Sequence, residues 1–424
     1  MCKLFSYYEH YKGVAAGVNI EPGTIPEYSF LKKRDDEEQA KCFRLYANEL
    51  GINIELSYFI GVDWISEGTQ AIYVEPKLNN DSDQVDYLQM LFSALKHPQV
   101  AHHTDQLFEI KFDKQFIEIE QQQDKLTPLL VVQFLTVVKN IVRKGLKKSY
   151  YKVDKNLFAK IKGKVLVGPS IKSNLLKNKP LHTVCRYDEF GLNGLENRLL
   201  KKTLIFIQHY LPTLKNIHSE KYTTETFNYI NPAFETVSAE VDLNDIKRTK
   251  TNPFYKEYAE AIHLAKLILK RFGYNITNTQ PQEKIKTPPF WIDMSKLFEL
   301  YVLGLLKDRF HNDVLYHFSS YWNELDYLLC RPDYKMVIDA KYKIRYQDQN
   351  GFKNEDIRQV SGYARLKSVY EALGKNQNEV IDCLIIYPDQ TNGSENLFDV
   401  NLKENEISQF VNCFKHGVKL PLLQ

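Results

Sequence analysis

Three aspartates, Asp326, Asp333 and Asp339, lie within the stretch ELDYLLCRPDYKMVIDAKYK, residues 324 to 343. If Pro332 and Asp333 form the tip of a β-hairpin, a symmetric loop of two or four residues places Asp326 directly opposite Asp339. The Cβ atoms of such a cross-strand pair are about 5 Å apart, so both carboxylates can bind one divalent ion. The stretch therefore predicts a metal site built across a hairpin.

Asp333 has a different expected role, because it falls in the turn. Proline presets the backbone of the first turn position, and aspartate is a common turn residue. We therefore interpret the Pro-Asp pair as loop chemistry. A loop of odd length or a β-bulge would break the register that pairs the other two aspartates.

Lys341 lies two residues after Asp339 and is expected on the same face of the strand. Two acids and a lysine suit hydrolysis of a phosphodiester: oxygen ligands hold Mg²⁺, a bound water becomes the nucleophile, and the lysine orients that water or stabilises the charge that develops on phosphorus. The alternative is an ordinary surface pair of opposite charges. The apolar Val337 and Ile338 favour the site, because an acid that ends a buried strand needs a partner.

The elements that would position these residues form a small α/β unit at residues 286–424. The pattern predicts a helix over 295–310 capped by Ser295, strands over 314–322, 324–330 and 335–343, a helix over 354–374, and a buried strand over 379–388.

Two further regions precede this unit, with the best boundary at residues 281–290. Residues 1–125 are expected to form an α+β domain, with strands in 57–77 joined at Glu67-Gly68, a helix over 84–96 capped by Ser82 or Asp83, and a helix over 36–50 that follows Asp35 and stops at Gly51. Residues 126–285 are expected to be mainly helical and basic, with helices in 131–146, 193–211 and 254–273.

Composition is that of a globular protein of two or three domains, with 43% hydrophobic and 26% charged residues among 424. We find no apolar run near the length of about eighteen residues that spans a bilayer, and no secretory signal at the N-terminus, so we expect a cytoplasmic protein without a membrane role. The six cysteines are scattered without a C-x-x-C pair, which argues against zinc and disulfides.

A basic stretch covers residues 139–164, with ten Lys or Arg against one acid and three interleaved aromatic residues. It could bind phosphates, form a solvated helix face, or meet an acidic partner. His102, His103 and His317 lack the spacing of a metal site, and Asn197 and Arg198 are expected to serve helix packing or capping.

The order of acid, hairpin and D-A-K-Y-K resembles the PD-(D/E)XK nuclease core, a mixed sheet flanked by helices. The helix residues Phe298 and Glu299 before it and the Gln359-x-x-x-Tyr363 pattern after it fit the same core. Blocks along most of the chain resemble the McrC family, the nuclease subunit of McrBC-type (5-methylcytosine-specific) restriction systems. These blocks are GVDWISEGTQAIYVEPKL, LQMLFSAL, RKGLKKSYYKVDKNLFAKIKGKV, RYDEFGLNGLENRLLK and KLFELYV.

The resemblance implies roles for single residues. Asp326 and Asp339 would bind the metal together with the Ala340 carbonyl, and Lys341 would be the catalytic lysine. Glu299 is a further catalytic candidate, although a solvated glutamate in the first helical turns fits equally. Gln359 and Tyr363, one helical turn apart, would support the site or touch DNA.

The basic stretch departs from the family pattern. Where the family often has an arginine-rich L-R-G-R block, this chain has Lys160, Lys162, Gly163 and Lys164. Lysine keeps the charge but lacks the bidentate fork of arginine. With Lys147 and Lys148, these lysines are candidates for contact with DNA or a partner.

The resemblance also implies partners and cofactors: Mg²⁺, with Mn²⁺ as a substitute; double-stranded DNA that carries a modification; and a separate McrB-like AAA+ GTPase ring. The N-terminal domain, residues 1–125, would dock on that ring. No G-x-x-x-x-G-K-[ST] motif occurs, so this chain is not expected to bind a nucleotide itself. The expected function is thus a DNA endonuclease subunit of a restriction complex in phage defence, activated by the GTPase and stimulating it. The alternatives are a non-catalytic adaptor of the NTPase ring with a silent nuclease fold and a free-standing repair nuclease.

Overall fold

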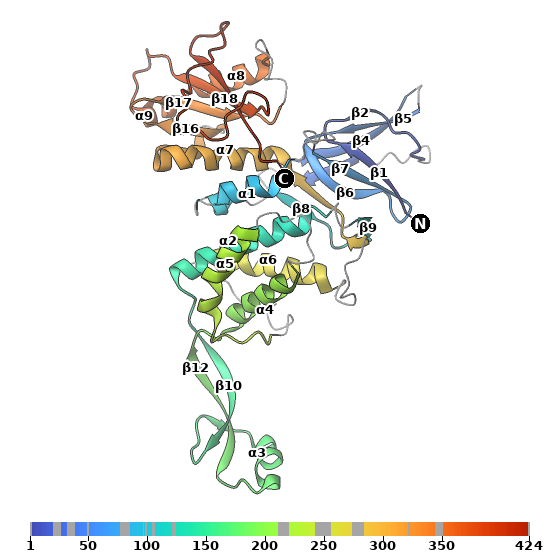
Figure 1. Ribbon diagram of the computed structural model, residues 1–424, viewed down its shortest axis with the longest axis vertical. Helices are drawn as coiled ribbons and strands as arrows, with labels where there is room; N and C mark the ends of the chain where they lie inside the picture. Colours follow the sequence, from blue (N-terminus) through green and yellow to red (C-terminus); the bar gives the residue numbers. More distant parts are fainter. Residues whose placement is uncertain are drawn as a thin grey trace. The chain divides into compact units, whose positions relative to one another are not determined.

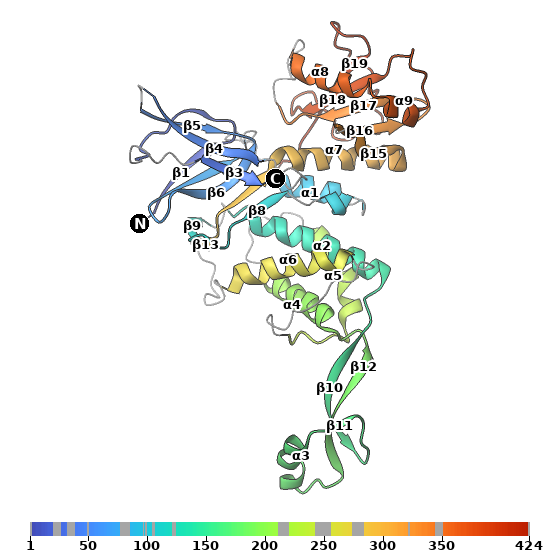
Figure 2. The same cartoon turned by 180° about the vertical axis from the view of Figure 1, so that it is seen from behind.

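The chain forms two compact units in the computed structural model, residues 1–132 with 280–424 and residues 133–279 (Figures 1 and 2). The first and last regions expected from the sequence thus fall in one unit, and their division into functional domains stays a prediction. The structure describes residues 2–19, 27–31, 39–48, 51–76, 85–95, 97, 100–103, 107–120, 124–210, 220–241, 256–273, 284–320, 323–343 and 351–422.

The N-terminal part of the first unit is built from three sheets. The largest has the order β1 (Lys3–Tyr8), β7 (Gln70–Glu75), β6 (Phe59–Ser66), β14 (Phe290–Asp293) and β8 (Phe108–Ile110). The second has the order β2 (Lys12–Val14), β5 (Gly51–Leu56), β4 (Gln39–Asn48) and β3 (Glu27–Leu31), and the third pairs β9 (Ile117–Glu120) with β13 (Lys284–Thr287). The predicted strands on either side of Glu67-Gly68 are confirmed as β6 and β7.

One predicted helix in this part is wrong. Residues 39–48 of the expected 36–50 helix form strand β4, and residues 36–38 lie outside the described residues. Phe43 and Leu45 are buried while Arg44 between them is exposed, which is the alternation of a strand. Gly51 ends no helix; it pairs with Asn48 across the β4–β5 hairpin and has a positive φ of 114°.

The helix α1 (Tyr87–Leu95) confirms the prediction over 84–96. Its expected caps, Ser82 and Asp83, lie outside the described residues. Asp86 Oδ1 accepts a hydrogen bond from the Gln89 amide at 2.9 Å, so Asp86 caps this helix. A 3₁₀ turn, η1 (Val100–His103), follows.

A buried carboxylate joins two strands of the largest sheet. Asp63 on β6 accepts hydrogen bonds from the indole of Trp291 on β14 at 2.8 Å and from the Trp64 amide at 2.7 Å. Burial raises the pKa of Asp63 to about 7, and the two hydrogen bonds only partly offset that rise. The folded protein therefore holds this proton at pH values where the unfolded chain has lost it.

The Asp63 carboxyl should make stability depend on pH. The pKa of Asp63 is higher in the folded protein than in the unfolded chain. Its favourable contribution to the free energy of unfolding is therefore complete below about pH 4 and is lost as the pH rises toward 7. The native chain should lose up to about 4 kcal/mol of its free energy of unfolding over this range, at about 1.36 kcal/mol for each pKa unit. Asp63→Asn should not show this loss, because asparagine does not titrate. Urea unfolding at pH 5 and pH 8, followed by tryptophan fluorescence, measures this difference. A difference that is the same at both pH values would contradict the prediction.

The C-terminal part of the first unit is a mixed five-stranded sheet. Its order is β15 (Val314–Ser320), β16 (Asn323–Cys330), β17 (Lys335–Ala340), β18 (Asp382–Pro388) and β19 (Cys413–Val418). The pairs β15–β16 and β16–β17 are antiparallel, whereas β17–β18 and β18–β19 are parallel. This confirms a mixed α/β unit in this part of the chain.

The helices of this part differ from expectation in two details. Helix α7 (Met294–Phe310) is capped by Asp293, whose carboxylate accepts from the Lys296 amide at 2.9 Å, so the prediction of Ser295 as the cap is wrong. The single helix expected over 354–374 is two helices, α8 (Asn354–Tyr363) and α9 (Lys367–Leu373). The 3₁₀ turn η8 (His311–Asp313) links α7 to β15.

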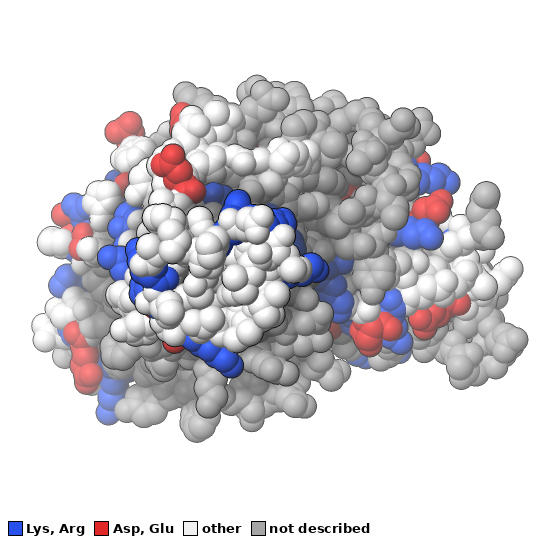
Figure 3. Space-filling view, turned by 90° about the horizontal axis from the view of Figure 1, so that it is seen from below, with Lys and Arg blue, Asp and Glu red and all other residues white. Residues whose placement is uncertain are grey.

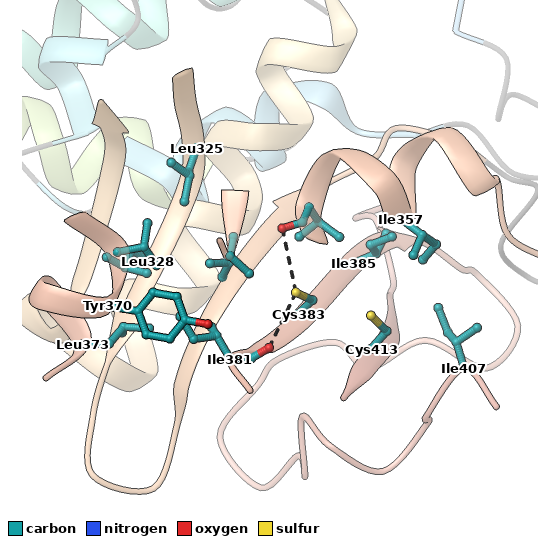
Figure 4. Close-up of a cluster of buried hydrophobic side chains, with 14 of the residues drawn as sticks. Leu325, Leu328, Ile357, Tyr370, Leu373, Ile381, Cys383, Ile385, Ile407 and Cys413 are labelled. Atoms are coloured by element: carbon teal, nitrogen blue, oxygen red, sulfur yellow. Dashed lines mark hydrogen bonds between the residues drawn. The ribbon is translucent and has the colours of Figure 1, made fainter. Parts of the chain in front are cut away.

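An apolar core lies between the sheet and helices α8 and α9 (Figure 4). Leu328 and Val337 come from the hairpin strands, Cys383 and Ile385 from β18, and Ile357 from α8. Cys383 donates a weak hydrogen bond to the Val360 carbonyl, drawn dashed in Figure 4. This packing fixes α8 over the end of β17, where Asp339 lies.

The second unit combines helices with an extended β-arm. Its helices are the greater part of α2 (Leu126–Lys144), α4 (Leu195–Tyr210), α5 (Glu220–Ile230) and α6 (Lys256–Gly273), with the 3₁₀ turn η5 (Asn231–Phe234). Helices α2, α4 and α6 confirm the helical periodicity, but a mainly helical region does not account for the arm. Long strands β10 (Ser149–Phe158) and β12 (His182–Gly191) pair along their whole length, and β11 (Lys164–Val165), α3 (Val167–Ser173) and η3 (Leu175–Lys177) complete its tip (Figure 1).

Helix α2 is long and apolar enough to cross a membrane by length and composition, contrary to our reading of the sequence. However, 78% of its most apolar window is buried within the protein, which is typical of the core helix of a globular protein.

Candidate metal site

The hairpin has the register that the sequence predicts. Tyr327 pairs with Ile338 and Cys330 with Lys335, and the Arg331 amide donates to the Tyr334 carbonyl at 3.0 Å, so Pro332 and Asp333 form the tip. The paired positions end at Tyr327 and Ile338, and one further step in the same register would set Asp326 opposite Asp339. The hydrogen bond from the Ala340 amide to Asp326 brings the two segments together at this point. Residues directly opposite in an antiparallel pair lie on one face of the sheet.

Both carboxyls are removed from water and affect each other. Asp339 is 1% exposed and Asp326 is half-buried. Burial raises the pKa of Asp326, and the charges of Asp339 and Glu299 raise it further. Asp326 Oδ2 accepts a hydrogen bond from the Ala340 amide at 2.8 Å, which ties it to the end of β17. Two acids at this spacing favour a cation between them.

The third predicted residue lies beside them. Lys341 Nζ is 2.7 Å from Asp339 Oδ2, and the Lys341 amide donates to the Ile386 carbonyl, which anchors its backbone to β18. Burial would lower the pKa of Lys341, but the Asp339 charge outweighs it and raises that pKa. The ammonium is thus held charged next to the two acids.

Helix α8 supplies the next contacts. Lys341 Nζ donates to Gln359 Oε1 at 3.0 Å, and Gln359 Nε2 donates to the Tyr363 hydroxyl at 2.8 Å. The structure therefore joins Asp339, Lys341, Gln359 and Tyr363 into one chain of contacts. Lys343 stays outside this chain of contacts, because its ammonium pairs with Asp356 at 2.8 Å and only its charge acts on Asp339.

Glu299, on α7, lies near the pair without joining it as a direct ligand. Its charge acts on Asp326, but its Oε1 contacts Lys296, Tyr316 and His317 instead. Among the described residues, no group of three His, Cys, Asp or Glu side chains lies close enough together to hold a metal ion.

The residues present nevertheless fit a hard cation with a partial protein shell. Asp339 Oδ2 is buried and has no hydrogen-bond partner of regular geometry in the described part of the chain, although it lies at ion-pair distance from Lys341. Burial raises the pKa of this carboxyl too, and a cation would relieve that cost. Two carboxylates and a backbone carbonyl leave several positions to water, as Mg²⁺ prefers.

The lysine candidates lie in two places. Lys147 is half-buried and pairs with Glu196 at 2.7 Å, so it serves the packing of the second unit, whereas Lys148 is exposed. Lys160, Lys162 and Lys164 are exposed at the tip of the arm, and Lys162 lies over the Tyr187 ring at 4.0 Å. The Gly163 among them has a positive φ of 69°, and a Cβ there would lie 2.4 Å from the Arg186 carbonyl oxygen.

The tip also exposes apolar side chains, which the sequence reading missed. Seen from below in Figure 3, Lys and Arg side chains rim a largely uncharged face. Five large apolar side chains at the tip are at least 60% exposed: Phe158, Ile161, Val167, Leu176 and Leu181. The buried core of the arm consists of Leu157, Cys185 and Tyr187. The exposed apolar side chains of the tip lie outside that core, so they are available for a contact with another molecule.

Asn197 and Arg198 serve packing, as expected. Asn197 donates to the carbonyls of Lys147 and Leu192 and accepts from the Tyr258 hydroxyl at 2.7 Å, while Arg198 Nε donates to Asn193. The sequence reading missed the residues around Glu299, namely Lys296, Tyr316, His317 and Glu324. Lys296 lies three residues before Glu299 on α7, which puts both on one face of the helix. No spacing links Glu299 to Tyr316, His317 or Glu324, because α7 meets β15 and β16 only in the fold.

Comparison with known proteins gives one family. The model of a McrBC 5-methylcytosine restriction system component matches residues 55–388. Among solved structures, the chain is similar to one from Thermococcus gammatolerans, a half-complex from a tetradecameric assembly of McrB AAA+ hexamers with bound McrC, at 14% identity and a TM-score of 0.40, covering 98% of this chain and 94% of that one. The cryo-EM structure of the McrBC complex of the same organism matches at 14% identity and a TM-score of 0.30, covering 72% and 87%. No curated protein matches.

Proposed function

This chain belongs to the McrBC 5-methylcytosine restriction system family, and we propose that it is the Mg²⁺-dependent DNA endonuclease subunit of such a system, with a PD-(D/E)XK nuclease core. The observation that carries the proposal is the end of the hairpin, where the register continued by one position would set two water-poor acids opposite each other, with Lys341 at ion-pair distance from Asp339.

Each residue then has a distinct task. Asp326, Asp339 and the Ala340 carbonyl would hold Mg²⁺, or Mn²⁺ in its place. When bound, the ion supplies a water of lowered pKa and screens the charge on a phosphate. Lys341 would orient that water and stabilise the negative charge that develops on phosphorus, and Gln359 holds the lysine in place with Tyr363 behind it.

The partners follow from the family. We propose double-stranded, modified DNA as the substrate and an AAA+ GTPase ring as the subunit that gates cleavage, since this chain has no P-loop sequence. Assembly on the ring would restrict cutting to recognised DNA. The chain is expected to work in the cytoplasm.

The direct test is reconstitution. Co-purification with a McrB-like AAA+ GTPase should give GTP-dependent cleavage of methylated but not unmethylated plasmid, in Mg²⁺ and not in EDTA. A silent nuclease fold that only stimulates the ring would instead raise GTP hydrolysis without metal-dependent cutting, and would replace this proposal.

The tip of the arm should be required for assembly rather than for chemistry. An exposed apolar face rimmed by lysines favours a protein partner over a phosphate backbone. We expect Ile161→Glu with Leu176→Glu to weaken binding to the ring by about 100-fold or more, because buried charges at an interface centre cost several kcal/mol.

Pull-down and GTPase stimulation measure the loss. Val411→Glu is the matched control, because it makes the same kind of change at an apolar side chain that is 73% exposed outside the arm. Normal assembly of the double variant, combined with weaker DNA binding, would assign the tip to DNA instead.

A further inference from the structure

Glu299 Oε1 is surrounded by three polar side chains. The Tyr316 hydroxyl lies at 2.7 Å, His317 Nε2 at 2.7 Å and Lys296 Nζ at 3.4 Å. Lys296 also contacts the Tyr316 hydroxyl at 2.6 Å, and Tyr327 donates to the Glu299 backbone carbonyl at 2.6 Å. This carboxylate is therefore fixed from α7, β15 and β16 together.

These contacts keep Glu299 ionised although it is buried. Burial alone would raise its pKa, but the His317 hydrogen bond and the Lys296 charge outweigh burial and lower the pKa to about 2. The charge of Glu299 in turn raises the pKa of Asp326, the expected metal-binding acid, so Glu299 acts on the metal site through its charge.

His317 is the centre of this arrangement. Its Nδ1 lies 2.6 Å from Glu324 Oε1, so the ring bridges Glu324 on β16 and Glu299 on α7. It takes a left-handed backbone conformation, φ 51°, which is uncommon for residues other than glycine, and its ring stacks on Tyr316 at 4.0 Å. Such a conformation persists where the surrounding contacts require it, often at functional sites.

The other oxygen of Glu299 is left over. Its Oε2 has no hydrogen bond or ion pair with the residues that the structure describes, while Oε1 receives all of the contacts above. A fixed, ionised carboxylate with one spare oxygen, whose charge acts on Asp326, is suited to accept a hydrogen bond from a water of a hydrated cation.

We propose that His317 is a positioning residue of the metal site: by bridging Glu299 and Glu324, it holds Glu299 so that Oε2 accepts a hydrogen bond from a metal-bound water. The proposal rests on the metal site of the proposed function. It explains how Glu299 takes part although, in the part of the chain that the structure describes, no third His, Cys, Asp or Glu side chain groups with Asp326 and Asp339.

The test is Mn²⁺ binding to the full chain by isothermal titration. His317→Asn keeps a residue that tolerates the left-handed conformation but is too short to bridge the two glutamates. We expect about a 10-fold loss of Mn²⁺ affinity, the lower range for loss of an outer-sphere partner. His311→Asn is the matched control, because His311 is also left-handed, φ 50°, but is exposed in η8; it should bind Mn²⁺ as the native chain does.

Two more variants separate positioning from general structure. Because His317 is proposed to act through Glu299, Glu299→Gln with His317→Asn should bind Mn²⁺ no more weakly than Glu299→Gln alone. His317→Gln, which keeps a donor for Glu299, should recover most of the affinity.

Two results would overturn the role of His317: native Mn²⁺ affinity in His317→Asn, or losses of affinity that add in the double variant. The metal site itself would still be supported if Asp339→Asn abolishes Mn²⁺ binding. Absence of Mn²⁺ binding by the native chain would instead count against the proposed function itself.

Discussion

Asp339→Asn is expected to lower DNA cleavage by the assembled complex by about 1,000-fold or more, since loss of a residue on which the chemistry depends has effects of this order. The asparagine keeps the shape of the side chain but removes the charge that attracts the cation. Because Asp339 lies at the end of a buried strand, where burial raises its pKa, the variant should fold at least as well as the native chain. Plasmid cleavage and GTP hydrolysis measured on the same complex check both points, and GTP hydrolysis should be unchanged.

The same hairpin offers the control. Asp333 is 66% exposed at the turn, and its contact with Arg331 is at 3.7 Å, so Asp333→Asn should cleave at the native rate. If the two variants cut equally well, the acids of the hairpin do not carry the reaction. If Asp333→Asn alone were inactive, the turn aspartate and not the paired acids would be the ligand.

Lys341→Met should separate metal binding from chemistry. The variant keeps the length of the side chain but has no ammonium to orient the attacking water, so we expect a loss of cleavage of roughly 100- to 1,000-fold, in the range of acid–base and charge-stabilising residues. Mn²⁺ should still bind, because both carboxylates remain. Titration with Mn²⁺ together with single-turnover cleavage measures the two effects separately.

Lys343→Met is the matched control for this variant. Lys343 lies two residues further along and pairs with Asp356 on α8 instead of with the acids of the hairpin. It should retain cleavage within a few-fold of the native rate. A Lys341→Met variant that cleaves normally, or that loses Mn²⁺ binding as well, would contradict the assigned role of the lysine.

The hairpin could be predicted from the sequence because its signals are local. Pro332 and Asp333 favour a turn, and a strand with apolar residues lies on each side of it. The turn and the register of the two strands are therefore set by residues close together in the sequence. A role for Gln359 in supporting the site or touching DNA was expected only through the family pattern. Its contact with Lys341 was not predicted, since it joins two elements that are distant in the chain.

Features set by distant contacts could not be predicted in this way. Residues 39–48 resemble a helix by their flanking signals, but pairing with β3 and β5 makes them a strand. His317 offers no spacing to Glu299, because α7 and β15 come together only when the sheet forms. The arm was missed because its basic strands lack apolar periodicity, the signal on which strand prediction depends.

The most direct measurement is anomalous diffraction from crystals soaked in Mn²⁺. The account predicts a metal peak between the carboxylates of Asp326 and Asp339, within bonding distance of the Ala340 carbonyl oxygen, with a metal-bound water hydrogen-bonded to Glu299 Oε2. A fully loaded crystal with no ion between these two acids, or with the ion held elsewhere, would contradict it.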